Sequence, residues 1–80
     1  MLKVDTLATI KALNECVGRS VSYTELRYIY KYYGGSKGGM AKALELIVDQ
    51  RQESLEWDNR IGDGRRLEVW VKVKSTISTV

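Results

Sequence analysis

The 80-residue chain contains no histidine and a single cysteine, Cys16. These absences exclude zinc sites built from Cys and His ligands, Ser-His-Asp and Cys-His catalytic groups, and any disulfide within one chain. Most of the ten carboxylates lie beside Lys or Arg or at expected helix ends, where solvated ion pairing explains them. We therefore expect no enzymatic activity, no metal and no cofactor, and no small-molecule substrate is evident.

Long apolar stretches are also missing. No run approaches the ~20 apolar residues that span a bilayer, and the first residues lack the apolar segment of a secretion signal. Binding to a membrane surface is disfavoured as well, because no expected helix sets its lysines beside a wide exposed Leu/Trp face. We expect an intracellular, cytoplasmic protein without a membrane partner.

The composition is that of an ordinary globular protein, with 44% hydrophobic and 29% charged residues. A chain of this length forms one domain with one small core. We expect a single domain over residues 1–80, with its core over about 5–74. The tail, residues 75–80, has no usable periodicity and is expected to be disordered or an added strand.

The net charge of +3 is unevenly distributed. Residues 19–42 carry five basic side chains against one carboxylate, whereas residues 43–59 carry one arginine against five carboxylates. A second basic group follows at 60–66, with three arginines against Asp63. Two basic segments separated by an acidic one indicate a molecule with a binding side and a solvated side.

Apolar spacing of three and four predicts a first helix over residues 5–17. Asp5 or Thr6 would cap it and Gly18 would end it. Its apolar stripe consists of Leu7, Ile10, Leu13 and Val17. Residues 19–22 then form a short extended connector.

A second helix is predicted to start at Tyr23, because Ser22 and Glu25 have the spacing of a capping box. Gly34 ends it, and its apolar face consists of Leu26, Ile29, Tyr30 and Tyr33. Ser36 is the expected N-cap of a third helix that runs to about Gln52. Its buried stripe consists of Met40, Ala43, Leu44, Ile47 and Val48.

From residue 54 the apolar period changes to two, which predicts a β-hairpin. Its core face would carry Leu55 and Trp57 opposite Leu67, Val69, Val71 and Val73, with Trp70 facing away. Only an odd-numbered loop puts both sets on one face, so we expect a three-residue turn over 62–64 with Gly64 in the left-handed conformation. A two-residue turn at 63–64 would instead place the valines opposite Asp58 and Glu56.

The stretches "SVSYTELRYIYKYYGGSKGGMAKALELI" and "LEWDNRIGDGRRLEVWVKV" resemble a winged helix-turn-helix domain, and the resemblance covers residues 5–74. Gly34, Met40 and Ala43 match the glycine that opens the turn and the apolar residues six and nine positions later. Tyr30 stands where the pattern usually has a small residue. The small, tyrosine-rich, phenylalanine-free chain also resembles regulators of archaeal viruses and plasmids.

The resemblance implies an α+β fold of three helices followed by a two-stranded β-hairpin wing. It also implies a transcription regulator that binds double-stranded DNA, with a recognition helix over about 37–51 in the major groove and the wing tip, residues 60–66, on adjacent backbone or minor groove. The residues expected to contact DNA are Ser36, Lys37, Gly38, Gly39, Ala41, Lys42, Glu45, Arg60, Arg65 and Arg66.

The limited contact area of one small domain favours a homodimer on paired half-sites, with the first helix, the tail and Trp70 as candidate dimer surfaces. In a viral protein, the compartment would be the host cytoplasm. A protein-interaction module without DNA binding is the alternative function, since winged-helix folds also serve as docking units.

Four features have two interpretations each. Gly38 and Gly39 either let a phosphate approach the backbone or are loop residues before a helix that starts at Met40. The arginines of the 60–66 segment contact DNA or are merely solvated. Tyr28 and Tyr32 either pack under a neighbouring segment or bind nucleic acid. Cys16 is either a small buried hydrophobe or an intersubunit disulfide partner.

Overall fold

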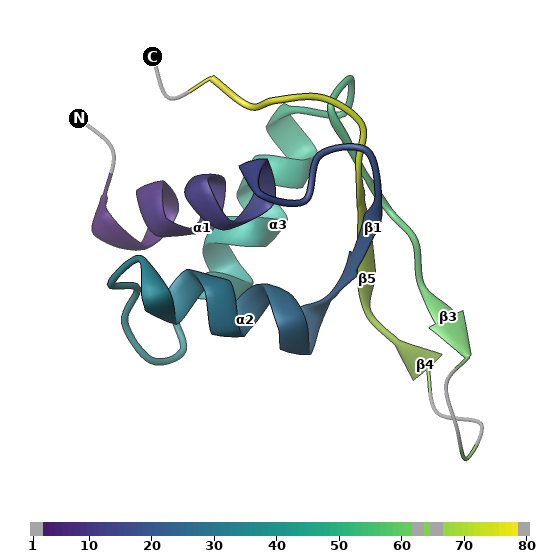
Figure 1. The fold of residues 1–80 in the computed structure, drawn as a ribbon, viewed down its shortest axis with the longest axis horizontal. Coiled ribbons are helices and arrows are strands. Elements are labelled where there is room, and N and C mark those ends of the chain that lie inside the picture. Colours follow the sequence, from purple (N-terminus) through teal and green to yellow (C-terminus); the bar gives the residue numbers. More distant parts are fainter. Residues whose placement is uncertain (1–2, 62–63, 65–66, 79–80) are drawn as a thin grey trace.

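The computed structural model describes residues 3–61, 64 and 67–78. Within them the architecture is α+β, with three helices at one end, a small antiparallel sheet at the other, and a narrow hairpin that extends from the sheet past the helices (Figure 1). The elements are α1 (Val4–Asn14), β1 (Ser20–Ser22), α2 (Tyr23–Tyr32), α3 (Met40–Gln50), β2 (Leu55–Trp57), β3 (Arg60–Ile61), β4 (Leu67–Glu68) and β5 (Trp70–Val73).

The first helix is shorter than predicted, and neither Asp5 nor Thr6 caps it. Helix α1 starts after Lys3, which makes no side-chain cap, and it ends at Asn14. The Cys16 N–H then bonds to the carbonyl of Leu13 (2.9 Å), which tightens the last turn. This tighter path buries Cys16 and leaves Val17 exposed, so Val17 is not part of the apolar stripe.

The connector after α1 is a strand, which makes a third strand in the described sheet where the sequence predicts only a two-stranded hairpin. Gly18, at a φ of +89°, turns the chain so that its N–H donates to the carbonyl of Val73 (2.8 Å). Strand β1 then pairs antiparallel with β5, with Val21 opposite Val71. Strand β5 is therefore held from both sides.

The second helix begins and ends where the sequence predicts. The Ser22 hydroxyl accepts the N–H of Glu25 (3.2 Å), as expected of an N-cap. The Glu25 carboxylate pairs with Arg19 (2.7 Å). Gly34, at a φ of +85°, follows the end of α2.

The hairpin has the predicted odd-numbered parity, but its register is shifted by two residues. Leu55 is opposite Val73, and Ile61 is opposite Leu67, whereas the predicted turn would pair Leu55 with Val71. Residues 62, 63, 65 and 66 of the turn lie outside the described residues, and Gly64 has the expected left-handed φ of +77°. Because β1 fixes β5 in the core from its other side, packing rather than the turn sets the register.

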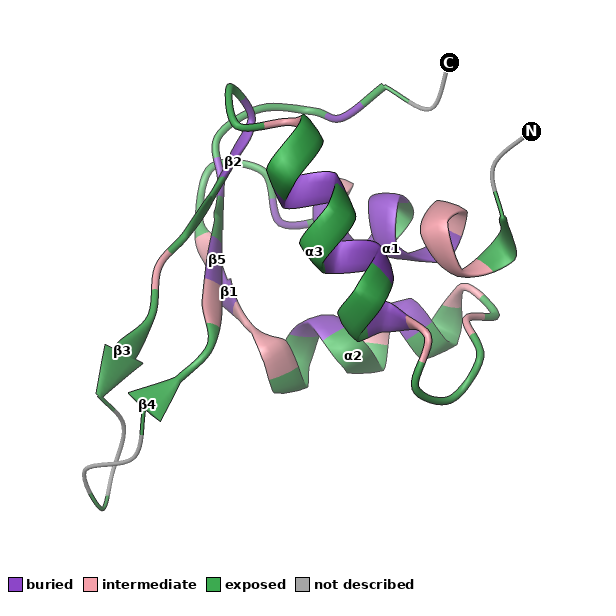
Figure 2. Ribbon diagram, turned by 180° about the vertical axis from the view of Figure 1, so that it is seen from behind, coloured by how far each residue is buried: buried purple, intermediate pink, exposed green. Residues whose placement is uncertain are grey.

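The three helices and the foot of the hairpin, formed by β2 and β5, enclose one core (Figure 2). Every predicted position of the α3 stripe is buried. The tail is neither disordered nor a strand through Ser78, because the Asn14 side chain accepts the Ile77 N–H (2.8 Å) and donates to its carbonyl (3.1 Å). The core side chains include Leu13, Leu26, Tyr30, Met40, Leu44, Leu55, Val71, Val73 and Ile77.

Replacing the buried Leu44 of α3 should threaten the whole domain. We expect Leu44→Ala to lower the free energy of unfolding by about 2 to 5 kcal/mol, through lost apolar burial and the cavity left behind. Leu46→Ala is the matched control, because Leu46 lies on the same helix and is exposed. Chemical denaturation of both variants measures the difference, and equal stabilities would show that α3 does not carry the core.

Candidate nucleic-acid interface

The loop between α2 and α3 is fastened to the first turn of α1. The backbone N–H of Ser36 donates to Asp5 Oδ1 (2.9 Å), and the Ser36 hydroxyl lies within 2.7 Å of Asp5 Oδ2. The Tyr30 hydroxyl donates to the Ser36 carbonyl (2.8 Å). These bonds join α1, α2 and the loop at one point, which fixes where α3 begins.

The contacts among Asp5, Tyr30 and Ser36 accompany pKa shifts of Asp5 and Tyr30 in opposite directions. The Ser36 backbone N–H, and next its hydroxyl, hold the pKa of the Asp5 carboxyl below its ordinary value of 3.8. Burial raises the pKa of the Tyr30 phenol, which disfavours the charged phenolate. The ionised carboxylate and the neutral phenol are thus the forms that the fold stabilises.

Ser36 is not the N-cap of α3, contrary to the sequence prediction. Its side chain is committed to Asp5, and α3 begins at Met40 with Gly39 in the N-cap position and no side-chain cap. Lys37, Gly38 and Gly39 therefore precede the helix, so the recognition helix predicted over 37–51 spans 40–50 instead. The helix starts at Met40, after both Gly38 and Gly39, as the second interpretation of these glycines has it.

Two of the loop glycines are explained by packing inside the protein. A Cβ atom at Gly35 would collide with the ring of Tyr30, and one at Gly39 would collide with the Asp5 carboxylate and the Tyr30 hydroxyl. Gly38 has a φ of +81° and faces open space. The large Tyr30, which departs from the helix-turn-helix pattern, is thus accommodated by glycines farther along the chain.

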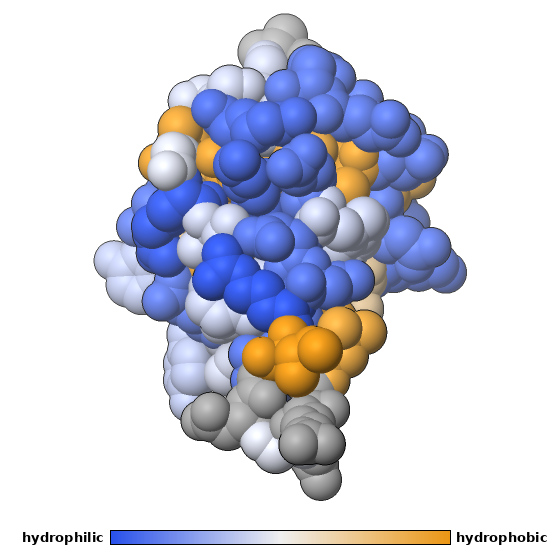
Figure 3. All heavy atoms as spheres, turned by 90° about the vertical axis from the view of Figure 1, so that its right-hand side faces the viewer, coloured by the Kyte–Doolittle hydropathy of each residue, from blue (hydrophilic) through white to orange (hydrophobic). Residues whose placement is uncertain are grey.

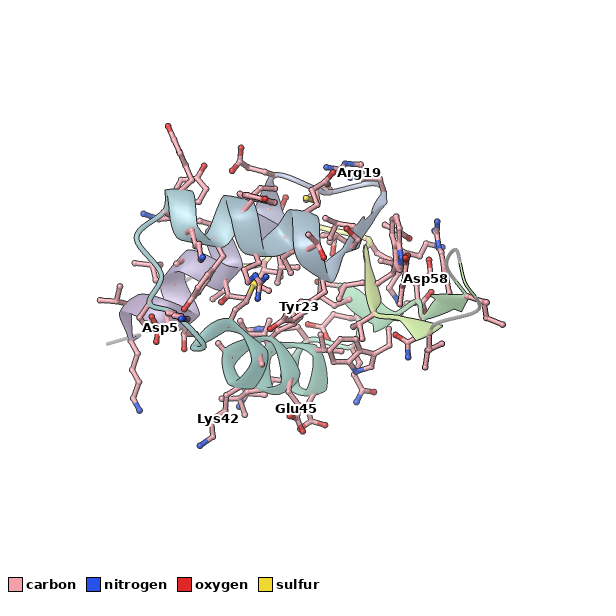
Figure 4. The ribbon with its side chains drawn as sticks, turned by 90° about the horizontal axis from the view of Figure 1, so that it is seen from below. Asp5, Arg19, Tyr23, Lys42, Glu45 and Asp58 are labelled. Carbon is pink, nitrogen blue, oxygen red and sulfur yellow. The ribbon has the colours of Figure 1, made fainter. Side chains whose placement is uncertain are left out.

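The outward face of α3 is basic at its start and acidic beyond it. Lys42 and Glu45 point away from α1 and α2 (Figure 4), and Ala41 and Asp49 are exposed as well. Lys37 is exposed in the preceding loop. In the described part of the chain neither lysine forms an ion pair. The N–H groups of the first turn, which no side chain caps, and these two cations favour anions, while the ionised Asp5 carboxylate beside Gly39 already supplies one negative charge at this end of α3.

Arg60, the hairpin arginine that lies within the described residues, contacts other side chains of the hairpin. Arg60 pairs with Asp58 (2.9 Å), and its guanidinium lies 4.3 Å from the ring centre of Trp70. Hydrogen bonds from Ser20, and then from Arg60, lower the pKa of Asp58. The Arg60 guanidinium therefore covers part of the Trp70 ring. The other two predicted contacts, Arg65 and Arg66, lie outside the described residues.

An apolar strip along the hairpin is the surface feature that the sequence prediction missed. It is made of Trp57, Ile61, Leu67 and Val69, which are 44%, 76%, 68% and 40% exposed, and is here called the hairpin strip. Hydrophobic side chains gather on this part of the hairpin in Figure 3. The prediction that Leu67 and Val69 pack on the core is wrong, because the paired strands continue beyond the helices (Figure 2).

An open hollow lies beside the foot of the hairpin. It has a volume of about 410 Å³ and borders α3, the first residue of α2 and the two hairpin strands. In Figure 4, Tyr23 points into the space between α2 and α3. The residues that line the hollow are Tyr23, Ala41, Leu44, Glu45, Trp57 and Val69.

Tyr28, Tyr32 and Cys16 are the remaining residues for which the sequence leaves two interpretations. Tyr28 and Tyr32 are exposed on α2, so no described segment of this chain packs over them. Cys16 is buried, and burial raises the pKa of its thiol, in agreement with a small core hydrophobe.

In the described residues, no three His, Cys, Asp or Glu side chains are grouped to hold a metal ion, and no helix has the length and apolarity to cross a membrane.

Comparisons with protein-family models, with curated proteins and with solved structures found no match to this chain.

A methyl group at Gly35 should be costly only while the Tyr30 ring is present. We expect Gly35→Ala to destabilise the protein by about 1 to 3 kcal/mol through overpacking. In a Tyr30→Leu background, which removes the colliding ring atoms, the same change should cost much less. Denaturation of the four proteins of this double-mutant cycle measures the coupling, and an equal cost in both backgrounds would refute the proposed fit.

Asp5 should make stability depend on pH in the acidic range. Because its folded pKa is lowered, its contribution is fully present above about pH 5 and is lost as the pH falls through 3.8 and below. Asp58 has a lowered pKa too and loses its contribution in the same range. We expect Asp5→Asn to unfold at a lower temperature than the wild type at pH 7, with the difference shrinking towards pH 2.

The control for this comparison is Asp49→Asn, which removes a carboxylate from the exposed face of α3. Thermal unfolding followed by circular dichroism supplies the data. A difference between Asp5→Asn and wild type that stays constant from pH 7 to pH 2 would show that the Asp5 charge does not fasten the loop.

Proposed function

We propose that the protein is a transcription regulator that binds double-stranded DNA through a winged helix-turn-helix fold. The order of helix, strand, two helices and a projecting antiparallel hairpin supports this layout. In such domains the third helix enters the major groove and the hairpin reaches neighbouring backbone. The protein would act without enzymatic chemistry and inside the cell.

The observation that carries the proposal is the start of α3. Its first turn has no side-chain cap, and the exposed Lys37 and Lys42 flank it. Free N–H groups, the positive end of the helix dipole and two lysines together attract phosphate. Gly38 borders open space, so the backbone there is accessible to the DNA.

The charges along α3 indicate how the helix would enter the groove. Beyond Lys42 its exposed residues include Glu45 and Asp49, which phosphates repel. We infer that α3 enters with its N-terminal end forward, as recognition helices do. Glu45 would then accept a hydrogen bond from cytosine N4 on a base edge, away from the phosphates.

The hairpin tip would supply the second contact. Arg60, and Arg65 and Arg66 by their place in the sequence, would meet phosphates or the minor groove. Arg60 would have to exchange its bond to Asp58 for the phosphate contact. Because one module of this kind covers about 600 to 1,000 Å² of DNA, a homodimer on two half-sites is the expected binding form.

The exposed hairpin strip favours a second candidate function, a protein-interaction module. Four apolar side chains on one projecting face are unusual for a surface that meets only phosphates. The two functions differ in their dependence on salt. DNA binding weakens steeply as salt rises, whereas apolar docking does not.

Selection of bound duplexes from random DNA, followed by titration of the best duplex at several salt concentrations, tests the proposed function. We expect an enriched sequence and a linear fall of log K with log[salt]. A palindrome with half-sites about 10 bp apart would support the homodimer. If no duplex binds even at low salt, the regulator proposal fails and the interaction module remains.

Lys37→Ala and Lys42→Ala should each weaken DNA binding and reduce the salt slope by about 0.9, the loss of one phosphate contact. Their melting temperatures should stay close to that of the wild type, because both side chains are exposed. Lys31→Ala removes the same charge from the outer face of α2 and serves as the control. Equal effects of all three variants on affinity and slope would show that net charge alone drives binding.

A further inference from the structure

The outer side of α2 carries two tyrosines that no described part of the chain covers. Tyr28 and Tyr32 are 75% and 82% exposed. They are four residues apart, which places both rings on the same side of the helix, one turn from each other. In Figure 2 the ribbon of α2 changes between buried and exposed segments, because only its inner side meets the core. Two large aromatic rings left side by side in water indicate a contact surface.

The Tyr32 ring is oriented by a neighbour without being buried. It meets the Tyr33 ring edge-on, with ring centres 5.1 Å apart and planes at 83°. Tyr33 itself packs against the core, and Lys11 lies 5.8 Å from its ring centre. Hydrogen bonding to Glu15 raises the pKa of the Tyr33 phenol. Because Tyr33 is fixed in this way, Tyr32 can receive a flat partner at a reduced cost in side-chain ordering.

Two cations lie beside the tyrosines. Arg27 and Lys31 are exposed and are also one turn apart on the outer side of α2. Among the described residues neither forms an ion pair, and the one carboxylate of α2, Glu25, is paired with Arg19. The outer side of α2 is thus aromatic and positively charged, which suits an anionic partner that carries flat rings.

The spacing of the two tyrosines favours bases that are not stacked on each other. Four residues of an α-helix rise about 6 Å. Successive bases of a stacked strand are only about 3.4 Å apart. Neighbouring bases can therefore lie on one ring each only where the strand is unstacked. A duplex keeps its bases inside the helix, so their faces are not accessible to these side chains.

We propose that Arg27, Tyr28, Lys31 and Tyr32 form a binding site for single-stranded DNA, here called the α2 face. The two rings stack on neighbouring bases, and the two cations contact the phosphates of the same strand. Every base has a flat face, so this site binds with little sequence preference. A nucleic-acid strand is favoured over an acidic peptide because each of its units carries both an anion and a flat ring.

The choice of DNA over RNA rests on the proposed function, whereas the stacking of bases on the α2 face does not. None of the four side chains of the α2 face belongs to the residues proposed to contact duplex DNA. A duplex at α3 and a single strand at the α2 face therefore do not compete for the same side chains. The two sites can be tested with separate variants.

Fluorescence anisotropy of a labelled oligodeoxythymidylate of about ten nucleotides measures the dissociation constant of the α2 face. We expect Tyr28→Leu/Tyr32→Leu to weaken binding at least about tenfold, because leucine keeps an apolar side chain but offers no stacking face. Tyr28→Phe/Tyr32→Phe is the matched control and should bind nearly as tightly as the wild type. Both tyrosines are exposed, so the variants should remain folded, which circular dichroism checks.

Titration of the same strand at several salt concentrations tests the two cations. Arg27→Gln and Lys31→Gln should each reduce the slope of log K against log[salt] by about 0.7, the loss of one phosphate contact on a single strand. Lys72→Gln, which removes an exposed lysine from β5, should leave the slope unchanged. An abasic strand of the same length keeps the phosphates without the bases and should bind at least about tenfold more weakly.

Unchanged affinity in Tyr28→Leu/Tyr32→Leu would overturn the proposal, as would a wild-type protein that does not bind oligodeoxythymidylate even at low salt. An abasic strand or polyglutamate that binds as tightly as oligodeoxythymidylate would show that the α2 face recognises charge alone. Tighter binding of an oligouridylate of the same length would overturn the choice of DNA.

Failure of the proposed function would be seen separately. Lys42→Ala should weaken duplex binding and leave the affinity for oligodeoxythymidylate unchanged, whereas Tyr28→Leu/Tyr32→Leu should have the opposite pair of effects. A protein that binds oligodeoxythymidylate through the α2 face and binds no duplex would refute the regulator function and retain the single-strand site.

Discussion

The rest of this structure depends on how the Tyr30 side chain of α2 packs against α1 and the loop before α3. Its ring is buried, and its hydroxyl reaches the same serine that binds the Asp5 carboxylate. Glycines at 35 and 39 leave the space that the ring and the carboxylate fill. Because Ser36 is occupied in this way, it cannot cap α3, and the helix starts late with open N–H groups beside its two lysines. The uncapped start of α3 is thus a by-product of how the core is closed.

Local patterns in the sequence predicted the elements well. The period of 3.6 identified the buried faces of α2 and α3, and the spacing of Ser22 and Glu25 located the start of α2, because each signal acts within a few residues. The errors came from contacts distant in the chain. The Asp5–Ser36 bond spans 31 residues, β1 exists only because β5 lies beside it, and Asn14 fixes Ile77 from 63 residues away. A single sequence shows which residue types are present, but it does not show which distant residues come into contact in the fold.

The candidate site was predictable in its residue types and less so in its shape. Lys37, Lys42 and Glu45 are exposed as the helical pattern indicates, whereas Ser36 is used internally and Arg60 stacks on Trp70. Alternation correctly put Leu67 and Val69 on the apolar face of the hairpin. It cannot indicate how far the helices extend along that face, since the cover depends on the length of elements elsewhere. The hairpin strip is the part of the alternating pattern that the core does not reach.

The bracing of β5 divides the hairpin into two parts with different local stability. At the foot, β5 bonds to β1 and β2. The Tyr23 N–H also donates to the carbonyl of Val69, just before β5, and the Gly18 N–H donates to the carbonyl of Val73, the last residue of β5. Beyond Val69 each strand has one neighbour and no helix above it. Amide hydrogens at the foot should therefore exchange with solvent only when the whole domain unfolds, whereas those of β3 and β4 exchange through local opening. Whatever binds the tip would slow that local exchange and leave the protection of the foot unchanged.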